Sequence, residues 1–526
     1  MKKHTRRILA LLSAVALSLS LAACNGEGGQ QASSGAGVDG ELFTSDTKLE
    51  IVVGSHVSWP YNENWAVWQN FRETVGGDIT ITAIPNETIE TKINLMLTSP
   101  ETLPDLIHSN DGKKKIADVN AGTGAFIAFD DYADQMPNYT AFFNSMDEAT
   151  RESVFMQRRS NDGKIYYSPV TGTDKLTGLR SWLYRKDVFE NHGLKTPMTM
   201  EELHDVCVEL KKLYPDSYPL AFRYGITGMN IFLPSWRSGF KSGVFYDFKN
   251  EKWTVGAMEP EMKDIINYFT MMADEGLIPP NYTTIEHKAW EELVSTNRAF
   301  IIPDYNVRID YFSPAARVEN PDFAFAVMTP PRASGPNGQN KIMKAGMDVS
   351  GYLIPNTGDE KRIANAVKLL DWFYSDEGSE LMNWGIEGET YEEVDGVKKF
   401  ILPEGAADAQ SAFGFGTQGT YVRMDPQAQL FTYSQEVRDQ VDFANECTEE
   451  FASPTGYIAF TEEEQAIINN YGEALNNFVE EEVSKFYLKQ RPMSEYDAFV
   501  NTLKTSMHIE EVLGAYESAY NRAMGK

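Results

Sequence analysis

The sequence predicts an α/β fold with a mostly parallel sheet and at least two lobes. Short apolar strands alternate with helical patterns through most of the chain, which is the order expected of βαβ units. The chain has 526 residues, of which 42% are hydrophobic, and a body of this length is expected to divide into more than one core. The last part of the chain has a helical pattern only. We therefore expect α/β lobes followed by a helical carboxyl-terminal region.

The amino terminus has the pattern of a secretory signal. Basic residues within positions 2–7 precede an apolar run, 8–23, that is shorter than the ~20 residues a membrane-spanning helix needs. The small residues of LAAC (21–24) suit a signal peptidase, and Cys24 resembles the lipidated cysteine of bacterial lipoproteins, which carries a diacylglyceryl group with acyl chains such as palmitate. The alternative is an ordinary cleavage site followed by a cysteine by chance. Residues 1–23 are therefore predicted to be a signal peptide.

Residues 24–45 are expected to form a lipid-anchored flexible tether. Gly, Ser, Ala and Gln dominate between positions 25 and 40, and such a segment cannot bury enough apolar surface to become ordered. Two acyl chains on Cys24 would hold the protein to a bilayer more firmly than one. No later apolar stretch is long enough to span a membrane. We therefore expect an extracellular body that is attached to the outer face of the cell membrane through lipid alone.

The charge of the chain argues against nucleic acid as a partner. Lys and Arg together number 47 and Asp and Glu together 76, for a net charge of −29, and removal of the basic signal makes the remainder more negative still. Phosphate binding needs a basic footprint, which this composition does not provide. Polyanionic ligands are disfavoured for the same reason, although a local basic pocket could escape the overall balance.

The cysteine and histidine content predicts no metal site and no cofactor. Cys207 lies on the apolar stripe of a predicted helix with Leu203 and Leu210, which indicates a buried, inert thiol. A disulfide between Cys207 and Cys447 remains possible from the sequence. Neither CxxC pairs nor His clusters occur, so a zinc site is not expected.

The first lobe is predicted from strands and helices that alternate after the tether. Each strand is a short apolar run rich in Ile, Val, Leu or Phe, and each helical segment has the longer apolar spacing of an amphipathic helix. The strands are expected at 49–55, 78–84, 104–109 and 124–129, and the helical segments at 63–76 and 87–98.

The rest of the chain begins with a helical series and then returns to strands. Thr199 and Glu202 have the spacing of a capping box, and residues 261–275 repeat apolar side chains at helical spacing. Strand character resumes at 299–304, 323–328 and 351–355. The carboxyl end is helical from Thr461, which forms a second capping box with Glu464.

Polar and aromatic side chains follow several of the predicted strands. In open α/β sheets a ligand binds beyond the carboxyl ends of the strands. Planar polar groups beside aromatic faces suit a sugar, whose hydroxyls take directional hydrogen bonds while its C–H faces lie on the rings. A structural role is equally open for any one of these residues, so their shared position is what points to a site. They are Ser55, His56, Ser58, Trp59, Tyr61 and Asn62 after the first strand, Ser109, Asn110 and Asp111 after the third, and Asp304, Tyr305 and Arg308 after the strand at 299–304.

Several sequence features together resemble a known family. The LAAC sequence that ends at Cys24, which resembles the lipobox of bacterial lipoproteins, is followed by three further segments. They are SWLYRKDVFENHGLKTPMTMEEL (181–203), NWGIEGETYEEV (383–394) and QRPMSEYDAFVNTLKT (490–505). In this order they look like the extracellular solute-binding proteins of ABC importers, specifically the large sugar-binding lipoproteins of Gram-positive bacteria. The resemblance extends over essentially the whole mature chain. It implies a two-lobed α/β fold similar to that of periplasmic binding proteins, with a ligand cleft between the lobes and a helical carboxyl-terminal region.

The resemblance also implies domain boundaries and partners. Crossovers are expected near 168–174, 298–304 and 344–350. They divide the body into an amino-terminal lobe, 46–170 plus 300–346, and a carboxyl-terminal lobe, 171–299 plus 347–526. The protein is expected to be a monomer that delivers its ligand to the permease subunits of an importer with a cytosolic ATPase. The chain has no GxxxxGK[ST] motif, so the ATP hydrolysis must come from that partner.

Twelve positions match the family pattern for ligand-binding residues. Glu387 among them could instead be a solvated surface charge. The related alginate-binding proteins have a calcium loop after the helix that here ends at KKLYPDSYPLA (211–221), and this stretch lacks the alternating oxygen ligands of such a loop, so no metal is expected. The implied ligand-binding residues are Trp59, Asn62, Ser109, Asp111, Asn230, Trp236, Asp304, Tyr305, Arg308, Trp384, Glu387 and Tyr391.

The function predicted from these features is capture of a carbohydrate, in particular a neutral oligosaccharide, for import, without enzymatic activity. A first alternative is a surface glycoside hydrolase, which would need two carboxylates about 5–10 Å apart. With 76 acidic residues, such a pair can always be nominated, so the composition does not separate the two functions. A second alternative is binding of peptides in place of sugars.

Overall fold

The structure is a computed structural model of the whole chain. The signal peptide, Cys24, residues 25–40 of the tether and Asp111 lie outside the residues that it describes. The described residues are 41–99, 102–109, 113–156, 158–160, 162–173, 178–237, 243–247, 250–335, 338–343, 350–417, 421–449, 458 and 460–524.

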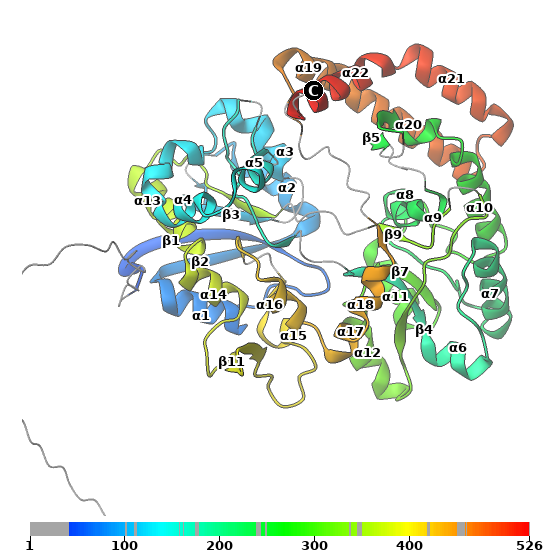
Figure 1. The fold of residues 1–526 in the computed structure, drawn as a ribbon, viewed down its shortest axis with the longest axis horizontal. Coiled ribbons are helices and arrows are strands. Elements are labelled where there is room, and N and C mark those ends of the chain that lie inside the picture. The colour runs from blue at the N-terminus through cyan, green and yellow to red at the C-terminus, as the bar shows by residue number, and fades with distance from the viewer. Residues whose placement is uncertain are drawn as a thin grey trace, which may run out of the picture. The chain divides into compact units, whose positions relative to one another are not determined.

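The first sheet has the strand order β10-β3-β1-β2, and Figure 1 labels β1, β2 and β3 of it. The strands β1 (Phe43–Ser55), β2 (Gly76–Pro85) and β3 (Leu106–Ser109) are parallel, as predicted, and β10 (Gly351–Leu353) pairs antiparallel with β3 at the edge. β1 begins at Phe43, so the last positions assigned to the tether belong to the sheet. The strand expected at 124–129 is absent: Phe126 makes only an isolated bridge to Pro355, and a 3₁₀ helix begins at Phe129.

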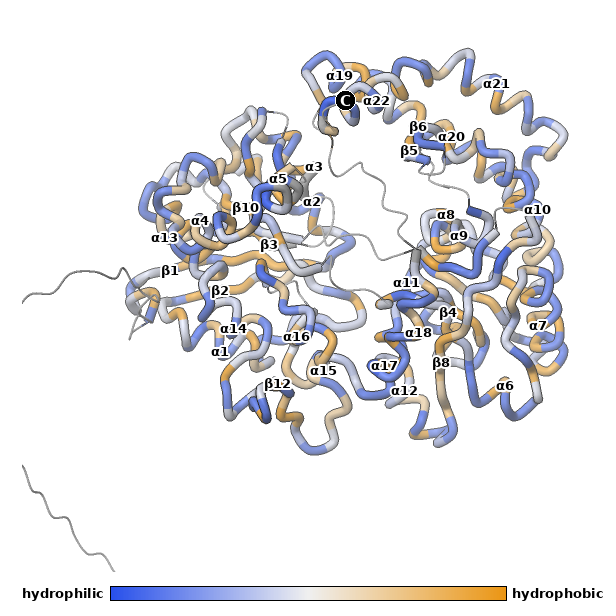
Figure 2. Tube along the Cα trace, viewed as in Figure 1, coloured by the Kyte–Doolittle hydropathy of each residue, from blue (hydrophilic) through white to orange (hydrophobic). Residues whose placement is uncertain are grey.

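Helices cover both faces of this sheet, because β1 buries side chains on both of its sides. Ile51 and Val53 pack in one cluster with α1 (Ala66–Val75), and Val52 points to the opposite face and packs with α2 (Asn86–Met96). α13 (Glu360–Phe373) joins the α1 side through its apolar stripe, including Trp372. Figure 2 shows hydrophobic residues along β1 and also on the helices around it, where they alternate with hydrophilic residues.

The other elements around the first sheet are short. They are α3 (Lys113–Asn120), α4 (Pro137–Asn144), α5 (Glu148–Met156), α14 (Asp376–Asn383), the hairpin β11 (Tyr391–Val394) and β12 (Val397–Phe400), α15 (Ala409–Phe413), α16 (Pro426–Phe431), and 3₁₀ turns at Ala121–Thr123 and Phe129–Gln135.

The second sheet has the order β7-β4-β8 and is antiparallel throughout. Its strands are β4 (Arg180–Arg185), β7 (Ile301–Tyr305) and β8 (Phe325–Met328). The expectation of a mostly parallel sheet therefore holds for the first sheet only. Trp182 and Leu183 of β4 belong to different apolar clusters, so this sheet also buries both of its faces.

The helices around the second sheet include the two that the sequence marked most clearly. In α7 (Met200–Leu213) the Thr199 hydroxyl accepts a hydrogen bond from the Glu202 amide at 3.1 Å, and in α10 (Met262–Asp274) the predicted apolar stripe is buried. The others are α6 (Lys186–His192), α8 (Gly225–Gly228), α9 (Leu233–Trp236), α11 (His287–Ser295), α12 (Arg308–Glu319), α17 (Gln435–Arg438) and α18 (Val441–Glu446), with 3₁₀ turns at Met229–Phe232 and Gly256–Met258. Short strands are β5 (Val244–Asp247), β6 (Lys252–Val255), β9 (Ile342–Met343) and β13 (Thr448–Glu449).

The carboxyl-terminal region is helical and packs on the second-sheet core. Leu475 and Phe486 of α20 (Glu473–Tyr487) share a cluster with Phe269 of α10. The predicted capping box of Thr461 and Glu464 is formed at the start of α19 (Glu462–Ile467). A π-helical turn (Ile468–Gly472) joins α19 to α20, and a 3₁₀ turn (Met493–Glu495), α21 (Tyr496–Ser506) and α22 (Ile509–Ala523) follow.

The division of the chain between the two sheets differs from the predicted lobes. Residues 300–346 were assigned to the amino-terminal lobe, but β7 and β8 in this segment pair with β4 of the second sheet. Residues 351–431 were assigned to the carboxyl-terminal lobe, but β10 pairs with β3, and α13 packs on the first sheet. We therefore call 43–173 plus 350–431 the first-sheet region and 178–343 plus 433–524 the second-sheet region.

The chain changes region at three places, and one of them was not predicted. The first change falls between Val170 and Leu179, and the second between Ile342 and Gly351, both near expected crossovers. The crossover expected at 298–304 is wrong, because this segment leads into strand β7 of the second sheet. The third change instead falls near position 432, between Ala428, which packs with Trp384, and Tyr433, which packs in the second-sheet region.

Both cysteines of the body are free and buried. Cys207 is on the buried face of α7, where burial raises the pKa of its thiol and makes the thiol unreactive. The disulfide alternative is therefore not realised. Within the described part of the chain, no helix combines the length and the apolar character that crossing a membrane requires.

Candidate functional site

The loop after β1 brings polar and aromatic side chains to the end of the first sheet. The Ser58 amide donates to Nδ1 of His56 at 3.0 Å, and the Tyr61 amide donates to the Ser55 hydroxyl at 3.0 Å, so the loop is closed by its own side chains. Burial, together with the nearby charges of Arg308 and Arg223, lowers the pKa of His56 to about 3. His56 is therefore uncharged and accepts a hydrogen bond at physiological pH.

The second-sheet region supplies the groups that meet this loop. His287 and Glu291 stand one turn apart on α11, Asp304 is the second-to-last residue of β7, and Arg308 begins α12. Arg223 reaches the same place from the segment before α8. We call the group formed by Ser58, Trp59, Arg223, His287, Glu291, Asp304, Arg308 and Tyr311 the Ser58 cluster.

The Ser58 hydroxyl is the point at which these groups converge. It donates to Oε1 of Glu291 at 2.9 Å, and it accepts from Arg308 Nη1 at 2.9 Å. Nε2 of His287 lies 3.1 Å from the same oxygen. Three side chains of the second-sheet region therefore contact one hydroxyl of the first-sheet region.

The hydrogen on His287 is fixed by its neighbours. Nδ1 lies 3.2 Å from Nη1 of Arg223, which can only donate, so Nδ1 accepts. The ring hydrogen is therefore on Nε2, which donates to Oε1 of Glu291 at 2.7 Å. Burial alone would raise the pKa of Glu291, but the hydrogen bonds from His287 and Ser58 bring it below its usual value.

Asp304 neutralises the arginines of the cluster. Arg223 binds it through both carboxylate oxygens, at 2.5 and 2.8 Å, and Arg308 Nε lies 3.6 Å from Oδ1. Burial would raise the pKa of Asp304, and the two arginines outweigh that effect and lower it. Asp304 and Arg308 are 3% and 1% exposed, so this is a buried ion-pair network.

Trp59 completes the cluster with an aromatic face. Its ring packs against Tyr311 of α12 and His56 at centroid distances of 5.4 and 5.3 Å, and the Arg308 guanidinium carbon lies 5.6 Å from the ring centre. Trp59 is 8% exposed. An apolar ring thus lies directly beside donors and acceptors of hydrogen bonds.

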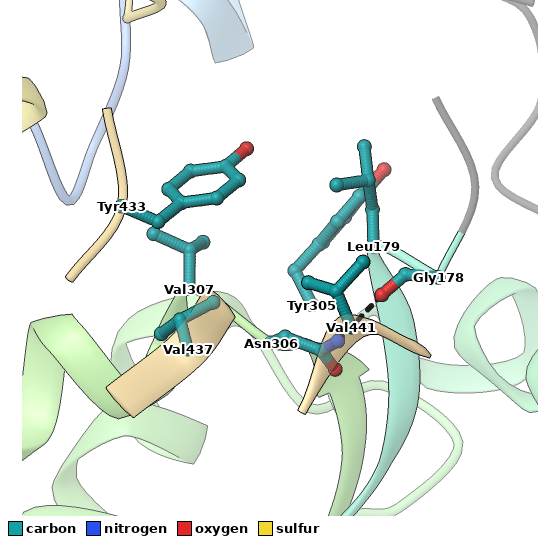
Figure 3. Close-up of a pocket in the computed structure, with 8 residues that line it drawn as sticks. All are labelled: Gly178, Leu179, Tyr305, Asn306, Val307, Tyr433, Val437 and Val441. Carbon is teal, nitrogen blue, oxygen red and sulfur yellow. Dashed lines mark hydrogen bonds between the residues drawn. The ribbon is translucent and has the colours of Figure 1, made fainter. Parts of the chain in front are cut away.

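Tyr305 lies next to the cluster and borders a small cavity (Figure 3). Its hydroxyl accepts from Arg180 Nη2 at 2.5 Å, and the Arg180 guanidinium carbon lies 4.4 Å from its ring centre. The cavity has a volume of about 10 Å³, which is the space of one water molecule. Figure 3 shows Tyr433 and Val307 on one side of it and Leu179 and Tyr305 on the other.

Trp384 and Tyr391 lie in a different place, within the first-sheet region. Trp384 is 1% exposed, packs against Phe400 at 5.0 Å, and donates its indole N–H to Asp425 at 2.7 Å. Tyr391 is also buried and donates its hydroxyl to Glu380. The implied place of Trp384 at the ligand cleft is not what the structure shows, because the β11–β12 hairpin packs over its ring. Glu387 is exposed in the turn before β11.

Trp236 and Asn230 lie in the second-sheet region but apart from the Ser58 cluster. Trp236 is 6% exposed and packs against Tyr268 and Phe269 at 5.5 and 6.1 Å, so its expected role as a cleft ring is largely replaced by core packing. One edge of it borders a cavity of about 470 Å³ together with Tyr268, Glu201 and Asp264. Asn230 is half-buried in the 3₁₀ turn before α9.

The remaining predicted residues have little side-chain structure to report. Asn62 is exposed, and its side chain accepts from the Asn64 amide at 3.0 Å. The backbone of Ser109 ends β3 and pairs with Gly351. Of the twelve predicted residues, the structure therefore brings together Trp59, Asp304 and Arg308, with Tyr305 beside them.

Sequence reasoning missed Arg223, His287, Glu291 and Tyr311, which complete the cluster. His287 and Glu291 have the i,i+4 spacing of one helix face, but this spacing occurs on many helices and carries no signal alone. Arg223 comes from a segment without a motif. Across the described ranges, no group of three or more His, Cys, Asp or Glu side chains is arranged to hold a metal ion.

Comparison with known sequences identifies a family. The sequence model of the bacterial extracellular solute-binding proteins matches residues 63–380. The polygalacturonan/rhamnogalacturonan-binding protein YtcQ of Bacillus subtilis is 23% identical over 391 residues, which cover 73% of this chain and 74% of YtcQ. Lipoprotein LipO of the same organism is 24% identical over 388 residues, covering 69% of this chain and 72% of LipO.

Comparison with solved structures identifies the fold. The crystal structure of the alginate-binding protein AlgQ2 without calcium ion superposes with a TM-score of 0.73 at 20% identity, covering 92% of this chain and 99% of AlgQ2. The S. pneumoniae ABC-transporter substrate-binding protein FusA in complex with kestose gives 0.69 at 16% identity, covering 91% of this chain and 100% of FusA. The predicted fold class, a two-lobed α/β solute-binding fold with a helical carboxyl-terminal region, is confirmed.

Proposed function

This chain belongs to the bacterial extracellular solute-binding proteins, and from that premise we propose that it captures a carbohydrate outside the cell and delivers it to the permease subunits of an ABC importer. Similar proteins support the ligand class, since YtcQ is named as a polygalacturonan/rhamnogalacturonan-binding protein and FusA was solved in complex with kestose. We propose that the protein acts as a monomer.

The observation that carries this proposal is the chemistry of the Ser58 cluster. Arg308 donates to a hydroxyl and Glu291 accepts from it, while Trp59 offers a ring beside them. Sugars need this combination, because each hydroxyl both donates and accepts while the C–H faces of the ring lie on aromatic carbon. Of the predicted binding residues, we propose that Trp59, Asp304, Tyr305 and Arg308 act together with Arg223, His287 and Glu291.

The charge balance of the cluster favours a neutral oligosaccharide. Arg223 and Arg308 pair with Asp304, and the Glu291 carboxylate lies 4.0 Å from Arg308. These two guanidinium groups are therefore already compensated by carboxylates of the protein. An acidic sugar would have to compete with Asp304 and Glu291 for them.

The same contacts argue against the hydrolase alternative. A serine nucleophile needs a base that takes its proton, but Nε2 of His287 already carries a hydrogen, so it cannot accept one from Ser58. A glycoside hydrolase needs a carboxylic acid with a raised pKa, whereas the pKa values of Asp304 and Glu291 are both lowered. We therefore propose binding without catalysis.

Calorimetry against a ligand panel tests the proposed function. The panel contains neutral oligosaccharides, galacturonate oligosaccharides and short peptides, and the recovered ligands are analysed by mass spectrometry. The proposal expects saturable binding of a neutral oligosaccharide that is recovered unchanged. Binding of peptides alone would overturn the ligand class, preference for galacturonate oligosaccharides would overturn the neutral assignment, and cleavage of the sugar would overturn the exclusion of catalysis.

We also propose that Cys24 anchors the protein to the outer face of the cell membrane. The support is the sequence around Cys24, together with the name of the relative LipO, a lipoprotein. Replacing Cys24 with Ser should release the protein into the medium, because the acyl chains provide the attachment. A Cys24→Ser protein that still sediments with membranes would contradict the anchor, and Cys207→Ser serves as the matched control that should remain attached.

A further inference from the structure

The groups around Ser58 form a site for a hydroxyl, and all of them come from the second-sheet region. Arg308 Nη1 donates to the oxygen at 2.9 Å, and Glu291 Oε1 accepts its hydrogen at 2.9 Å. Nε2 of His287, which donates its hydrogen to Glu291, lies 3.1 Å from the oxygen. Ser58 is the one member of this set that belongs to the first-sheet region. The hydroxyl and its receptors are therefore carried by different parts of the fold.

The three side chains that contact the Ser58 hydroxyl are held in place by contacts that do not depend on it. His287 and Glu291 hold each other at 2.7 Å, Arg223 holds Nδ1 of His287, and Asp304 holds Arg223. The side chains of Arg308, His287 and Glu291 are 2%, 7% and 16% exposed, so a group that binds them escapes competition from bulk water. None of these supporting contacts involves Ser58.

We propose that Arg308, His287 and Glu291 form a binding site for one hydroxyl of the carbohydrate ligand, and that Ser58 occupies this site when the ligand is absent. The inference rests on the proposed function for the class of ligand. An alcohol group of a sugar has the same capacity as the Ser58 hydroxyl, with one hydrogen to donate and two lone pairs to accept. Ser58 is thus an internal competitor of the ligand.

This arrangement has a consequence of definite sign for affinity. A ligand that must displace Ser58 binds only to the fraction of molecules in which Ser58 has left the site, so its apparent affinity is reduced by that fraction. Removing the hydroxyl should therefore tighten carbohydrate binding. An ordinary contact residue behaves in the opposite way, because its removal weakens binding.

The experiment measures the affinity of the Ser58→Ala protein by calorimetry with the oligosaccharide that the wild type binds. The expected result is binding about tenfold tighter than wild type, equivalent to ~1.4 kcal/mol. Ser58→Thr keeps a hydroxyl and should bind less tightly than Ser58→Ala. Ser55→Ala is the matched control at the end of β1, next to this loop, since Ser55 bonds only the Tyr61 amide in the described contacts, and it should not tighten binding. Unchanged or weaker binding by Ser58→Ala, or equal tightening by Ser55→Ala, would overturn the inference.

A second measurement tests, without any sugar, whether Ser58 occupies the hydroxyl site. Hydrogen exchange of the α11 backbone in the ligand-free protein should be faster in Ser58→Ala than in wild type, with Ser55→Ala unchanged. Equal exchange in wild type and Ser58→Ala would overturn the inference. If the wild type binds no sugar of the panel, the proposed function fails, and this measurement still decides whether Ser58 occupies the site.

Discussion

Trp59 and Trp384 have similar sequence surroundings but very different neighbours in the fold. Each lies in a loop-like segment with Pro, Gly or Asn close by, and both were expected to line a ligand cleft. In the structure, Trp59 lies beside Arg308 and Tyr311 of the second-sheet region. Trp384 is enclosed by Phe400, Tyr391 and Asp425 of its own first-sheet region.

The difference shows that local sequence marks where a chain leaves regular structure and does not say what covers it there. Trp384 is covered by the β11–β12 hairpin, which follows it directly in the chain. Trp59 meets α12, some 250 positions later, and with it a network of charged side chains. A ring among hydrogen-bonding groups from another region is suited to a ligand, and a ring sealed by its own hairpin is suited to packing.

The largest expected effect is on stability, from Trp384→Ala. Truncation of this ring leaves a cavity beneath the hairpin and removes the indole donor from Oδ2 of Asp425, and should cost ~3–5 kcal/mol of unfolding free energy. Chemical denaturation measures it, with Trp372→Ala, another buried ring of the first-sheet region, as the comparison. The carbohydrate affinity of the folded protein should be unchanged. A loss of binding without a loss of stability would indicate that Trp384 contacts the ligand.

A pH effect of the next size is expected from Asp310 on α12. Burial, with smaller contributions from the charges of Asp408 and Glu436, raises its pKa from the usual value of 3.8 to about 6. The folded state therefore binds a proton more tightly than the unfolded state, and this stabilisation is lost as the pH rises from about 4 to about 6. The loss in unfolding free energy over this pH range is about 3 kcal/mol.

Asp310→Asn tests this pH dependence and separates it from the Ser58 cluster on the same helix. The variant should lose less stability than wild type between pH 4 and pH 6, when unfolding is followed by denaturant titration at each pH. Asp408, whose pKa is also raised by burial, should retain its own contribution. Identical pH profiles for the two proteins would show that Asp310 does not titrate in this range.

A moderate effect on binding is expected from Trp59→Ala. Loss of a ring against a sugar face should remove roughly 1.4–2.8 kcal/mol of binding free energy, or one to two powers of ten in affinity. Calorimetry measures affinity, and the melting temperature should fall less than in Trp384→Ala. If Trp59→Ala melts far lower and yet binds normally, the distinction between the two tryptophans fails.

The smallest effect is expected from Glu387→Gln. This side chain is exposed in the turn before β11, so unfolding free energy should change by less than about 0.5 kcal/mol. The carbohydrate affinity of the Glu387→Gln protein tests the comparison of Trp59 with Trp384, because Glu387 is three positions from Trp384 in the chain. Weaker binding by the folded variant would indicate that the ligand reaches this hairpin after all.

The sequence by itself determined the local structure and the family. Apolar spacing predicted β1, α7 and α10, and the capping residues Thr199 and Thr461 marked helix starts that the structure confirms. These features depend on side chains a few positions apart, whose interactions are set by backbone geometry alone. The order of motifs indicated the two-lobed solute-binding fold for a related reason, since it reflects the order of elements along the chain.

The tertiary structure alone decided which segments share a region and which aromatic rings lie beside charges. Strand β10 pairs with β3 across some 240 positions, and β7 and β8 pair with β4, so the predicted lobe boundaries were wrong for 300–346 and for 351–431. His287 and Glu291 joined the site only because α11 meets the loop after β1, and Arg223 joined it through its contact with His287. Such contacts follow from the packing of whole elements, because a single side chain has no preferred partner until the surfaces that carry it are buried together.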